Sequence, residues 1–193
     1  MIVGGIVLAA GRSSRMGGNK LVADYAGKPL VAHAVDAVAD ALGRAPLVVT
    51  GHARAAVEGA LAGRCVEFTF AQHFAEGMSR SLAAGIAAVP RDWDAAIICL
   101  GDMPLIAPGL IRALAARAAW DAIVLPVRDG RRGHPVAWGR DFFAELTLID
   151  GDIGGKALLA KFGNAITELA WADDTIFVDV DTPATLADLR DRL

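Results

Sequence analysis

The chain has 193 residues and a formal net charge of −3, and this length suits one domain, over residues 1–193, with a core that needs no disulfides. Hydrophobic residues make up 54% and charged residues 21%, which excludes a disordered chain. The mildly acidic net charge argues against nucleic acid as a partner. Because no apolar run approaches the roughly 20 residues of a membrane helix, and the apolar start lacks the basic segment of a signal peptide, we expect a soluble cytoplasmic protein without a membrane partner.

Short apolar runs alternate with helical patterns along the chain. The first run, Ile2–Ala9, ends in a loop of Gly, Arg and Ser, as buried parallel strands often do. Further strands are predicted over Leu47–Thr50, Val66–Phe70, Ala95–Leu100, Ala122–Val127 and Ile176–Val180. Helices are predicted over Pro29–Leu42, Ala53–Leu61, Ser79–Val89, Pro108–Ala119, Arg140–Leu148, Gly155–Phe162 and Pro183–Arg190.

This alternation predicts an α/β fold with a doubly wound, mostly parallel sheet and right-handed crossovers. The segment DGRRGHPVAW interrupts the pattern, because Gly130 and Gly133 flank two arginines, and it predicts a small hairpin excursion from the sheet. Ligands of such sheets bind beyond the carboxyl ends of the strands. The residues that follow each strand are therefore the candidates for a site.

The loop after the first strand is rich in groups that bind phosphate. Residues 9–20 read AAGRSSRMGGNK. Glycine lets backbone N–H groups approach a phosphate, serine adds donors, and arginine and lysine neutralise its charge. The loop matches neither GxxxxGK[ST] nor GxGxxG, which excludes the two common nucleotide-binding motifs. It favours a polyphosphate ligand, and the alternative is a loop of solvated basic residues.

Acidic residues follow two of the later strands. Asp102 comes directly after a buried strand, where a carboxylate is well placed to hold Mg²⁺ together with phosphate oxygens and water. Asp179 and Asp181 are two residues apart on a predicted strand, so their carboxylates project from one face. The alternatives are capping roles, with Asp102 capping a turn and Asp181 or Thr182 beginning the helix at Pro183.

Other polar residues carry weaker signals. The Gly133–Pro135 turn contains a histidine that could bond a ligand, and the alternative is a solvated hairpin tip. Ser79 could contact a ligand or simply begin a helix. Cys65 and Cys99 lie on predicted strands, so we expect both in the core, and neither has the neighbours of a nucleophile.

Several segments of the chain together resemble one known family. In chain order they are LAAGRSSRMGGNKL, GKPLVAHAV, FAEGMSRSLAAGI, CLGDMP, GHPVAW and VDVDTP. They are similar to segments of the molybdenum cofactor cytidylyltransferases, which belong to the molybdopterin-nucleotide transferase family and have the Rossmann-like nucleotidyltransferase fold of the nucleotide-diphospho-sugar transferases. The resemblance runs from Ile2 to Leu189, and LAAGxSxRMGxxK together with GHP and DxDTP gives it specificity.

The resemblance implies a single nucleotidyltransferase domain that transfers CMP from CTP to the terminal phosphate of molybdopterin and releases pyrophosphate. It implies Mg²⁺ as cofactor, and a target molybdoenzyme as a further partner. The implied nucleotide-binding residues are Leu8, Ala9, Ala10, Gly11, Arg12, Ser13, Gly17, Lys20 and Gly101. The implied catalytic residues are Arg15, Lys20 and Asp102, and the implied metal ligands are Asp102, Asp179 and Asp181. The implied substrate-binding residues are Ser79, Gly133, His134, Pro135 and Asp152.

Two differences separate the chain from the guanylyl relatives within this resemblance. Those relatives typically read LAGG where this chain has LAAG at residues 8–11, and NxNTP where it has DVDTP at residues 179–183. Both differences favour transfer of a cytidylyl group. The alternatives are a guanylyltransferase, another nucleotidyltransferase for a phosphorylated small molecule, and a non-catalytic carrier of molybdenum cofactor.

Overall fold

The structure is a computed structural model that describes residues 1–12, 18–149 and 155–191. Its main sheet has the strand order β10-β7-β9-β6-β1-β4-β5, with β8 paired to β7. The strands are β1 (Val3–Ala9), β4 (Leu47–Thr50), β5 (Glu67–Phe70), β6 (Ala95–Leu100), β7 (Ile123–Arg128), β8 (Arg131–Arg132), β9 (Val136–Gly139) and β10 (Ile166–Ala170). All pairs are parallel except those that involve β8 and β9. The predicted doubly wound, mostly parallel α/β fold is confirmed.

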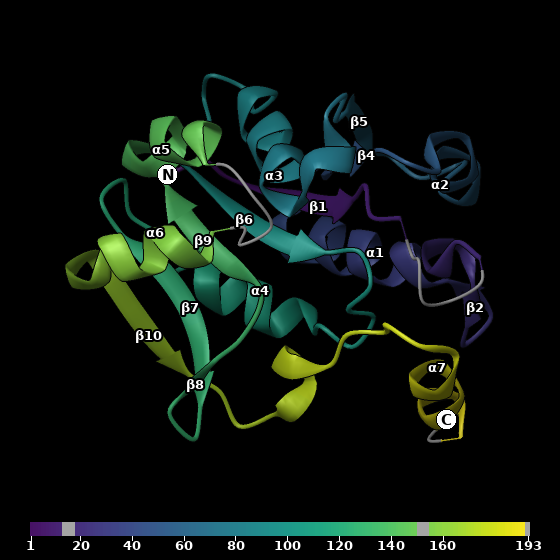
Figure 1. Cartoon of the computed structure of the whole chain (residues 1–193). Coiled ribbons are helices and arrows are strands. Elements are labelled where there is room, and N and C mark those ends of the chain that lie inside the picture. Colours follow the sequence, from purple (N-terminus) through teal and green to yellow (C-terminus); the bar gives the residue numbers. More distant parts are fainter. Residues whose placement is uncertain (13–17, 150–154, 192–193) are drawn as a thin grey trace.

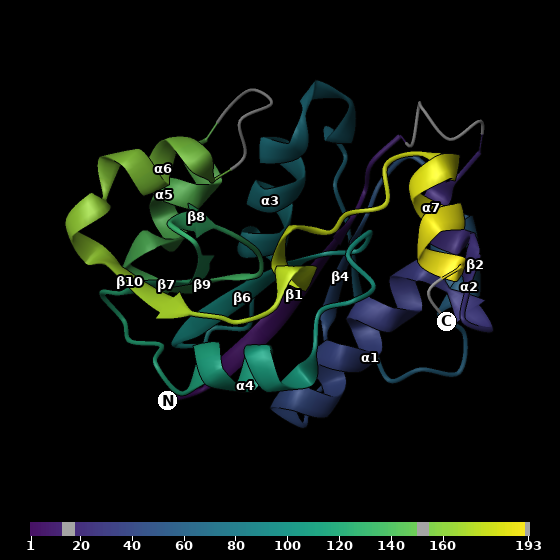
Figure 2. The same cartoon turned by 90° about the horizontal axis from the view of Figure 1, so that it is seen from below.

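Helices cover both faces of the sheet (Figures 1 and 2). They are α1 (Leu30–Leu42), α2 (Arg54–Ala60), α3 (Met78–Ala87), α4 (Pro108–Ala115), α5 (Phe143–Leu148), α6 (Lys156–Lys161) and α7 (Pro183–Arg190). Short 3-10 turns are η1 (Lys20–Val22), η2 (Phe74–Glu76), η3 (Arg140–Phe142), η4 (Gly163–Ala165) and η5 (Asp174–Phe177). Figure 2 separates α1 and α4 on one face of the sheet from α3, α5 and α6 on the other. Among the described residues, no helix combines the length and the apolar character needed to cross a bilayer.

The core has two layers because alternate residues of each strand point to opposite faces. In β1, Val7 packs in the layer that contains α1 and α4, while its neighbour Ile6 packs in the layer that contains α3 and α5. Both side chains are fully buried. Strands buried on both faces must be apolar throughout, which is why their sequences read as continuous apolar runs.

A small third hydrophobic cluster attaches the C-terminal helix α7 to the segment around the start of α1. Leu186 and Leu189 of α7 pack with Tyr25 and Leu30, next to the two-stranded sheet of β2 (Asp24–Tyr25) and β3 (Lys28–Pro29). Figures 1 and 2 both show α7 beside β2. The chain that leads to α7 must therefore cross the carboxyl ends of the central strands.

The predicted hairpin forms, but it leads back into the sheet. The turn between β7 and β8 uses Asp129 and Gly130 with φ angles of 51° and 74°, as a two-residue hairpin turn requires. After β8 the chain continues into β9, which lies antiparallel between β6 and β7, with Ala96 opposite Trp138. The excursion is thus limited to the short β8 turn, and β9 is an internal strand.

Three other expectations were wrong or incomplete. The predicted strand Ile176–Val180 is absent from the described structure, where η5 and an unpaired extended segment stand instead. The edge strand β10 was missed because three of its five residues are exposed, so it lacks a continuous apolar run. Cys65 is exposed in the loop before β5, whereas Cys99 is buried, which raises the pKa of its thiol to about 12.

A substitution at Gly139 tests the packing of the inserted strand β9. A Cβ atom at this position would lie 2.1 Å from the carbonyl oxygen of Trp120 and 2.2 Å from that of Ala119. Backbone atoms cannot rotate away, so Gly139→Ala should lower the free energy of unfolding by about 2 to 4 kcal/mol in chemical denaturation. The control is Gly109→Ala in α4, where a Cβ meets open space and the change should stay within about 1 kcal/mol. Equal stability of the two variants would contradict the placement of β9.

Candidate active site

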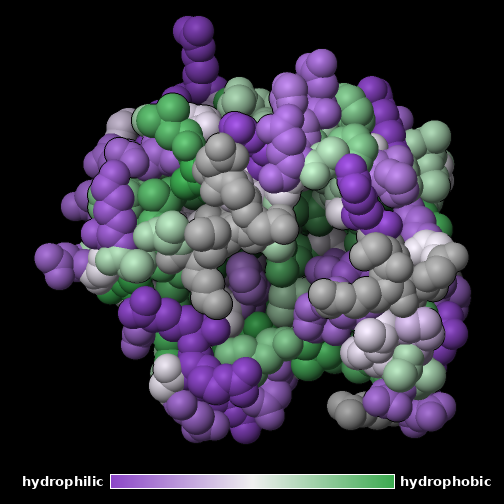
Figure 3. Space-filling model, viewed as in Figure 1, coloured by the Kyte–Doolittle hydropathy of each residue, from purple (hydrophilic) through white to green (hydrophobic). Residues whose placement is uncertain are grey.

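A cleft of about 550 Å³ lies at the carboxyl ends of β1 and β6. Figure 3 shows this face of the molecule hollowed near its centre, where hydrophilic and hydrophobic surfaces meet. The cleft is lined by Leu8, Ala10, Gly11, Arg12, Lys20, Leu21, Phe74, Ala75, Gly77, Met78, Ser81, Leu100, Asp102, Asp179 and Asp181. Its position agrees with the rule that ligands of such sheets bind beyond the strand ends.

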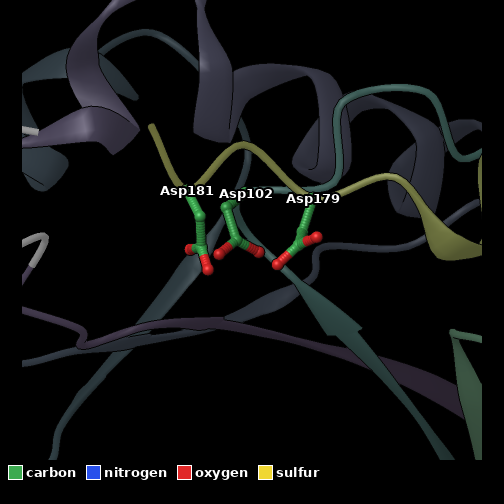
Figure 4. A group of neighbouring side chains, drawn as sticks. All are labelled: Asp102, Asp179 and Asp181. Atoms are coloured by element: carbon green, nitrogen blue, oxygen red, sulfur yellow. The ribbon is translucent and has the colours of Figure 1, made fainter. Parts of the chain in front are cut away.

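Three carboxyl groups meet on one wall of this cleft. Asp102, Asp179 and Asp181 each offer an oxygen, and these oxygens all lie within 4.8 Å of one another. Figure 4 shows the three carboxyl groups side by side and pointing the same way, with Asp102 between the other two in that view. The predicted convergence of these aspartates is therefore present in the structure.

Asp102 reaches the cleft because β6 ends two residues earlier, at Leu100. The Gly101 N–H donates to the Leu8 carbonyl at 3.0 Å, which extends the pairing of β1 and β6 past the last strand residue. Met103 is then buried in the core below the sheet end. Between these two anchors the Asp102 side chain is directed into the cleft, with 19% of its surface exposed.

Asp179 and Asp181 reach the same place from an unpaired, extended segment rather than from a strand. Val180 between them is fully buried, and its N–H donates to the Asp102 carbonyl at 3.0 Å. Since neighbouring side chains of an extended chain point in opposite directions, burial of Val180 turns both carboxylates into the cleft. Thr182 caps α7 through its hydroxyl, which accepts the Thr185 N–H at 3.2 Å, so Asp181 is not the capping residue.

The surroundings of Asp179 change its ionisation. Partial desolvation, and after it the neighbouring carboxylates of Asp181 and Asp102, raise the pKa of Asp179, and Lys20 offsets this only in part. The neighbouring carboxylates contribute to this rise because nearby like charges disfavour a further negative charge. The cluster therefore favours a cation.

Lys20 supplies a positive charge to this cluster. Its Nζ donates to Asp102 Oδ2 at 2.6 Å and to Asp181 Oδ1 at 2.6 Å. Burial alone would lower the pKa of the ammonium, but the two carboxylates outweigh burial and raise it. The backbone of Lys20 is fixed at the start of η1, where Asn19 Oδ1 accepts the Leu21 N–H at 3.1 Å and Leu21 is buried.

The opposite wall carries an arginine and the start of a helix. Arg12 lies with its guanidinium carbon 6.0 Å from the ring centre of Phe74. Gly77 and Met78 begin α3 at the cleft, which places the positive end of a helix dipole at its wall. Gly77 has a φ of 124°, a conformation that favours glycine. Sequence reasoning assigned Arg12 but not Phe74, Gly77 or Met78 of this wall, although the end of β5 met the same rule that selected Asp102.

The other predicted site residues fall into three groups. Five of the predicted nucleotide-binding residues line the cleft, namely Leu8, Ala10, Gly11, Arg12 and Lys20, while Ala9 and Gly101 are buried and do not line it. Four predicted residues lie outside the described residues, namely Ser13, Arg15, Gly17 and Asp152. Ser79 is fully buried in α3, and neither it nor Gly133, His134 or Pro135 lines the cleft. All their roles stay predictions.

The GHP turn is not a solvated hairpin tip. Gly133 is buried, and a Cβ there would lie 2.8 Å from Ile176 atoms. The His134 N–H donates to the Ile176 carbonyl at 3.0 Å. Burial lowers the pKa of the imidazole, and the nearby Asp102 and Asp179 offset this in part. Among the described residues, the buried His134 Nδ1 has no hydrogen-bond partner.

A doubly wound sheet with basic and acidic side chains in one cleft at its strand ends suits the nucleotidyltransferase class of proteins. Residues 5–168 match the MobA-like NTP transferase domain, and the chain belongs to this family. A nucleotidyl transferase from Methanothermobacter thermautotroptrophicus is 26% identical, with a TM-score of 0.87 and coverage of 99% of this chain and 97% of that one. Rv0371c from Mycobacterium tuberculosis, solved as a complex with manganese, is 25% identical, with a TM-score of 0.83 over the whole of both chains.

Curated relatives include much longer proteins. The bifunctional protein GlmU of Sinorhizobium fredii is 32% identical over 153 residues, which are 77% of this chain and 32% of that protein. The chain thus spans about a third of the length of this relative. Nucleotidyl transfer is supported by the family match and by the solved nucleotidyl transferase.

Proposed function

We propose that this chain transfers CMP from CTP to the terminal phosphate of molybdopterin and releases pyrophosphate. The observation that carries the nucleotidyl transfer is the cleft itself, which Arg12 and Lys20 line together with three convergent carboxylates. A polyphosphate would match the positive side chains of the cleft, and a divalent cation would match its carboxylates. The choice of CTP and molybdopterin rests on the resemblance of the sequence segments, and above all on LAAG and DVDTP.

The donor set fits Mg²⁺. Three carboxylates within 4.8 Å offer the hard oxygen ligands that this ion prefers, and phosphate oxygens and water can complete its coordination. We propose Asp102, Asp179 and Asp181 as the residues that would hold it. When bound, the ion would supply charge neutralisation and orientation for the phosphates. Manganese in the solved complex of Rv0371c supports divalent-metal use by a similar protein.

The proposed reaction needs positioning and charge rather than a protein nucleophile. An oxygen of the acceptor phosphate forms a bond to the α-phosphorus of the nucleotide, and the bond to the β-phosphate oxygen breaks as pyrophosphate leaves. Lys20 and Arg12 would offset the negative charge that gathers on the phosphates. The acceptor phosphate is already ionised near neutral pH, so no general base is required.

Ala10 is the proposed determinant of the base. Its carbonyl accepts the His52 N–H at 3.3 Å, and a Cβ on Gly51 would lie 2.7 Å from the Ala10 methyl. The methyl group therefore stands in tight packing where the loops after β1 and β4 meet, at the edge of the cleft. A glycine there, as in the guanylyl relatives, would change the space beside a planar base.

Measuring pyrophosphate release with each of the four nucleoside triphosphates, with and without molybdopterin, tests the proposal. We expect release only when CTP, Mg²⁺ and molybdopterin are combined. GTP should be slower by about tenfold or more, the usual effect of a methyl-sized change in a pocket. Equal or faster release with GTP would indicate a guanylyltransferase. Release with a sugar or polyol phosphate alone would indicate another acceptor, and tight pterin binding without any release would indicate a carrier.

A further inference from the structure

Lys20 forms ion pairs with two members of the acidic cluster that is proposed to hold the metal. Its Nζ lies 2.6 Å from one oxygen of Asp102 and 2.6 Å from one oxygen of Asp181. Only 11% of the Lys20 side chain is exposed, against 43% for Asp181. The ammonium is therefore held within the cluster and is not a surface partner at its rim.

Among the described residues, three carboxylates meet in this cluster, and Lys20 forms ion pairs with two of them, Asp102 and Asp181. These are the residues that are proposed to hold the metal. The lysine and a divalent cation would therefore compete for the same carboxylate oxygens. A divalent ion that used the same oxygens of Asp102 and Asp181 would stand within a few ångströms of Nζ, where like charges repel strongly in a partly desolvated site.

We propose that Lys20 is a displaceable counter-cation, which leaves Asp102 and Asp181 when a divalent metal binds them and turns to the phosphates of the nucleotide. The inference rests on the proposed metal-dependent function and adds to it an exchange of partners by Lys20 during binding. Without a nucleotide the released ammonium gains no phosphate partner, so the metal alone binds weakly. With a nucleotide both cations find oxygens, so metal and nucleotide strengthen each other's binding.

The test measures Mn²⁺ binding to the whole chain without nucleotide, by the electron paramagnetic resonance signal of the free ion. Lys20→Met removes the competing charge and keeps most of the side-chain volume. We expect Mn²⁺ to bind about tenfold more tightly or better, since a full positive charge has been removed from beside the site. Lys20→Gln should behave in the same way, and Lys20→Arg should keep the weak binding of the unmodified chain.

Lys28→Met is the matched control. Lys28 makes a comparable 2.6 Å ion pair with Asp36, neither residue lines the cleft, and Mn²⁺ binding should not change. Adding CTP should increase Mn²⁺ affinity in the unmodified chain by a larger factor than in Lys20→Met, because only the former gains the second phosphate contact.

Unchanged or weaker Mn²⁺ binding in both folded variants, Lys20→Met and Lys20→Gln, would overturn the inference and make Lys20 a fixed bridge. The readout requires neither acceptor nor turnover. Tighter binding without pyrophosphate release from any substrate would therefore keep the inference and reject the proposed reaction. Pyrophosphate release from CTP and molybdopterin, with Mn²⁺ binding unchanged in the Lys20 variants, would keep the proposed reaction and reject the inference.

Discussion

Replacing Asp102 with alanine is expected to lower turnover by about a thousandfold or more while the fold remains intact. Its carboxyl group lies beside those of Asp179 and Asp181 (Figure 4) and also accepts a hydrogen bond from Lys20. The substitution therefore removes a proposed metal ligand and one of the two anchors of the lysine at once. The backbone carbonyl that receives the Val180 N–H is retained, so the attachment of the C-terminal segment survives.

The measurement is pyrophosphate release from CTP and molybdopterin at saturating Mg²⁺, with circular dichroism and thermal unfolding as checks on the fold. Asp102→Asn should be similarly inactive, because an amide supplies no negative charge. The matched control is Asp36→Asn, which breaks ion pairs with Lys28 at 2.6 Å and Arg64 at 2.8 Å on a helix that the cleft does not include. It should retain activity. Normal turnover in Asp102→Ala would remove this residue from the metal site.

The sequence was sufficient to place the acidic cluster because one rule covers it. Parallel strands end at one edge of a sheet, so a polar residue a few positions after a buried strand lies at that edge. Asp102 obeys this rule after β6, as does Arg12 after β1. Asp179 and Asp181 converge even though their predicted strand is wrong. Alternation belongs to any extended backbone, and the burial of Val180 fixes which side the carboxylates take.

Pairing partners could not be predicted from local patterns. The turn residues Asp129 and Gly130 indicate a hairpin, but they do not tell which strand the returning chain will join, and β9 inserts between β6 and β7. The segment after Ile176 has a strand-like sequence, yet it forms no strand in the described structure, and the Val180 N–H donates to the Asp102 carbonyl beyond the end of β6. Whether an extended segment becomes a strand depends on which sheet edge is free, and that is a property of the whole fold.

The ion pairs of Lys20 could not be predicted from the sequence either. They join positions 82 and 161 residues apart in the chain, so no spacing in the sequence signals them. Sequence reasoning placed Lys20 in a phosphate-binding loop because the loop is basic. The structure places the ammonium among carboxylates instead, and the two observations agree if the lysine has different partners at different stages of binding.

Lys20→Ala is expected to lower turnover by about a hundredfold to a thousandfold, the usual loss when a charge-assisted contact to a developing negative charge is removed from a desolvated site. The loss should fall on kcat more than on KM, because Lys20 would stabilise the phosphates most as charge moves onto the leaving pyrophosphate. Lys20→Arg should recover part of the rate, since it restores the charge with a different shape.

The control for turnover is Lys28→Ala, which removes a lysine of similar pairing from outside the cleft and should leave kcat unchanged. Turnover of Lys20→Ala within about threefold of the unmodified chain would exclude a role of the ammonium in the reaction. The two measurements on Lys20 have opposite expected signs, because removing its charge should strengthen metal binding and weaken catalysis. A lysine that served only to hold the fold would weaken both, and a lysine that only bound phosphate would leave metal binding in the absence of nucleotide unchanged.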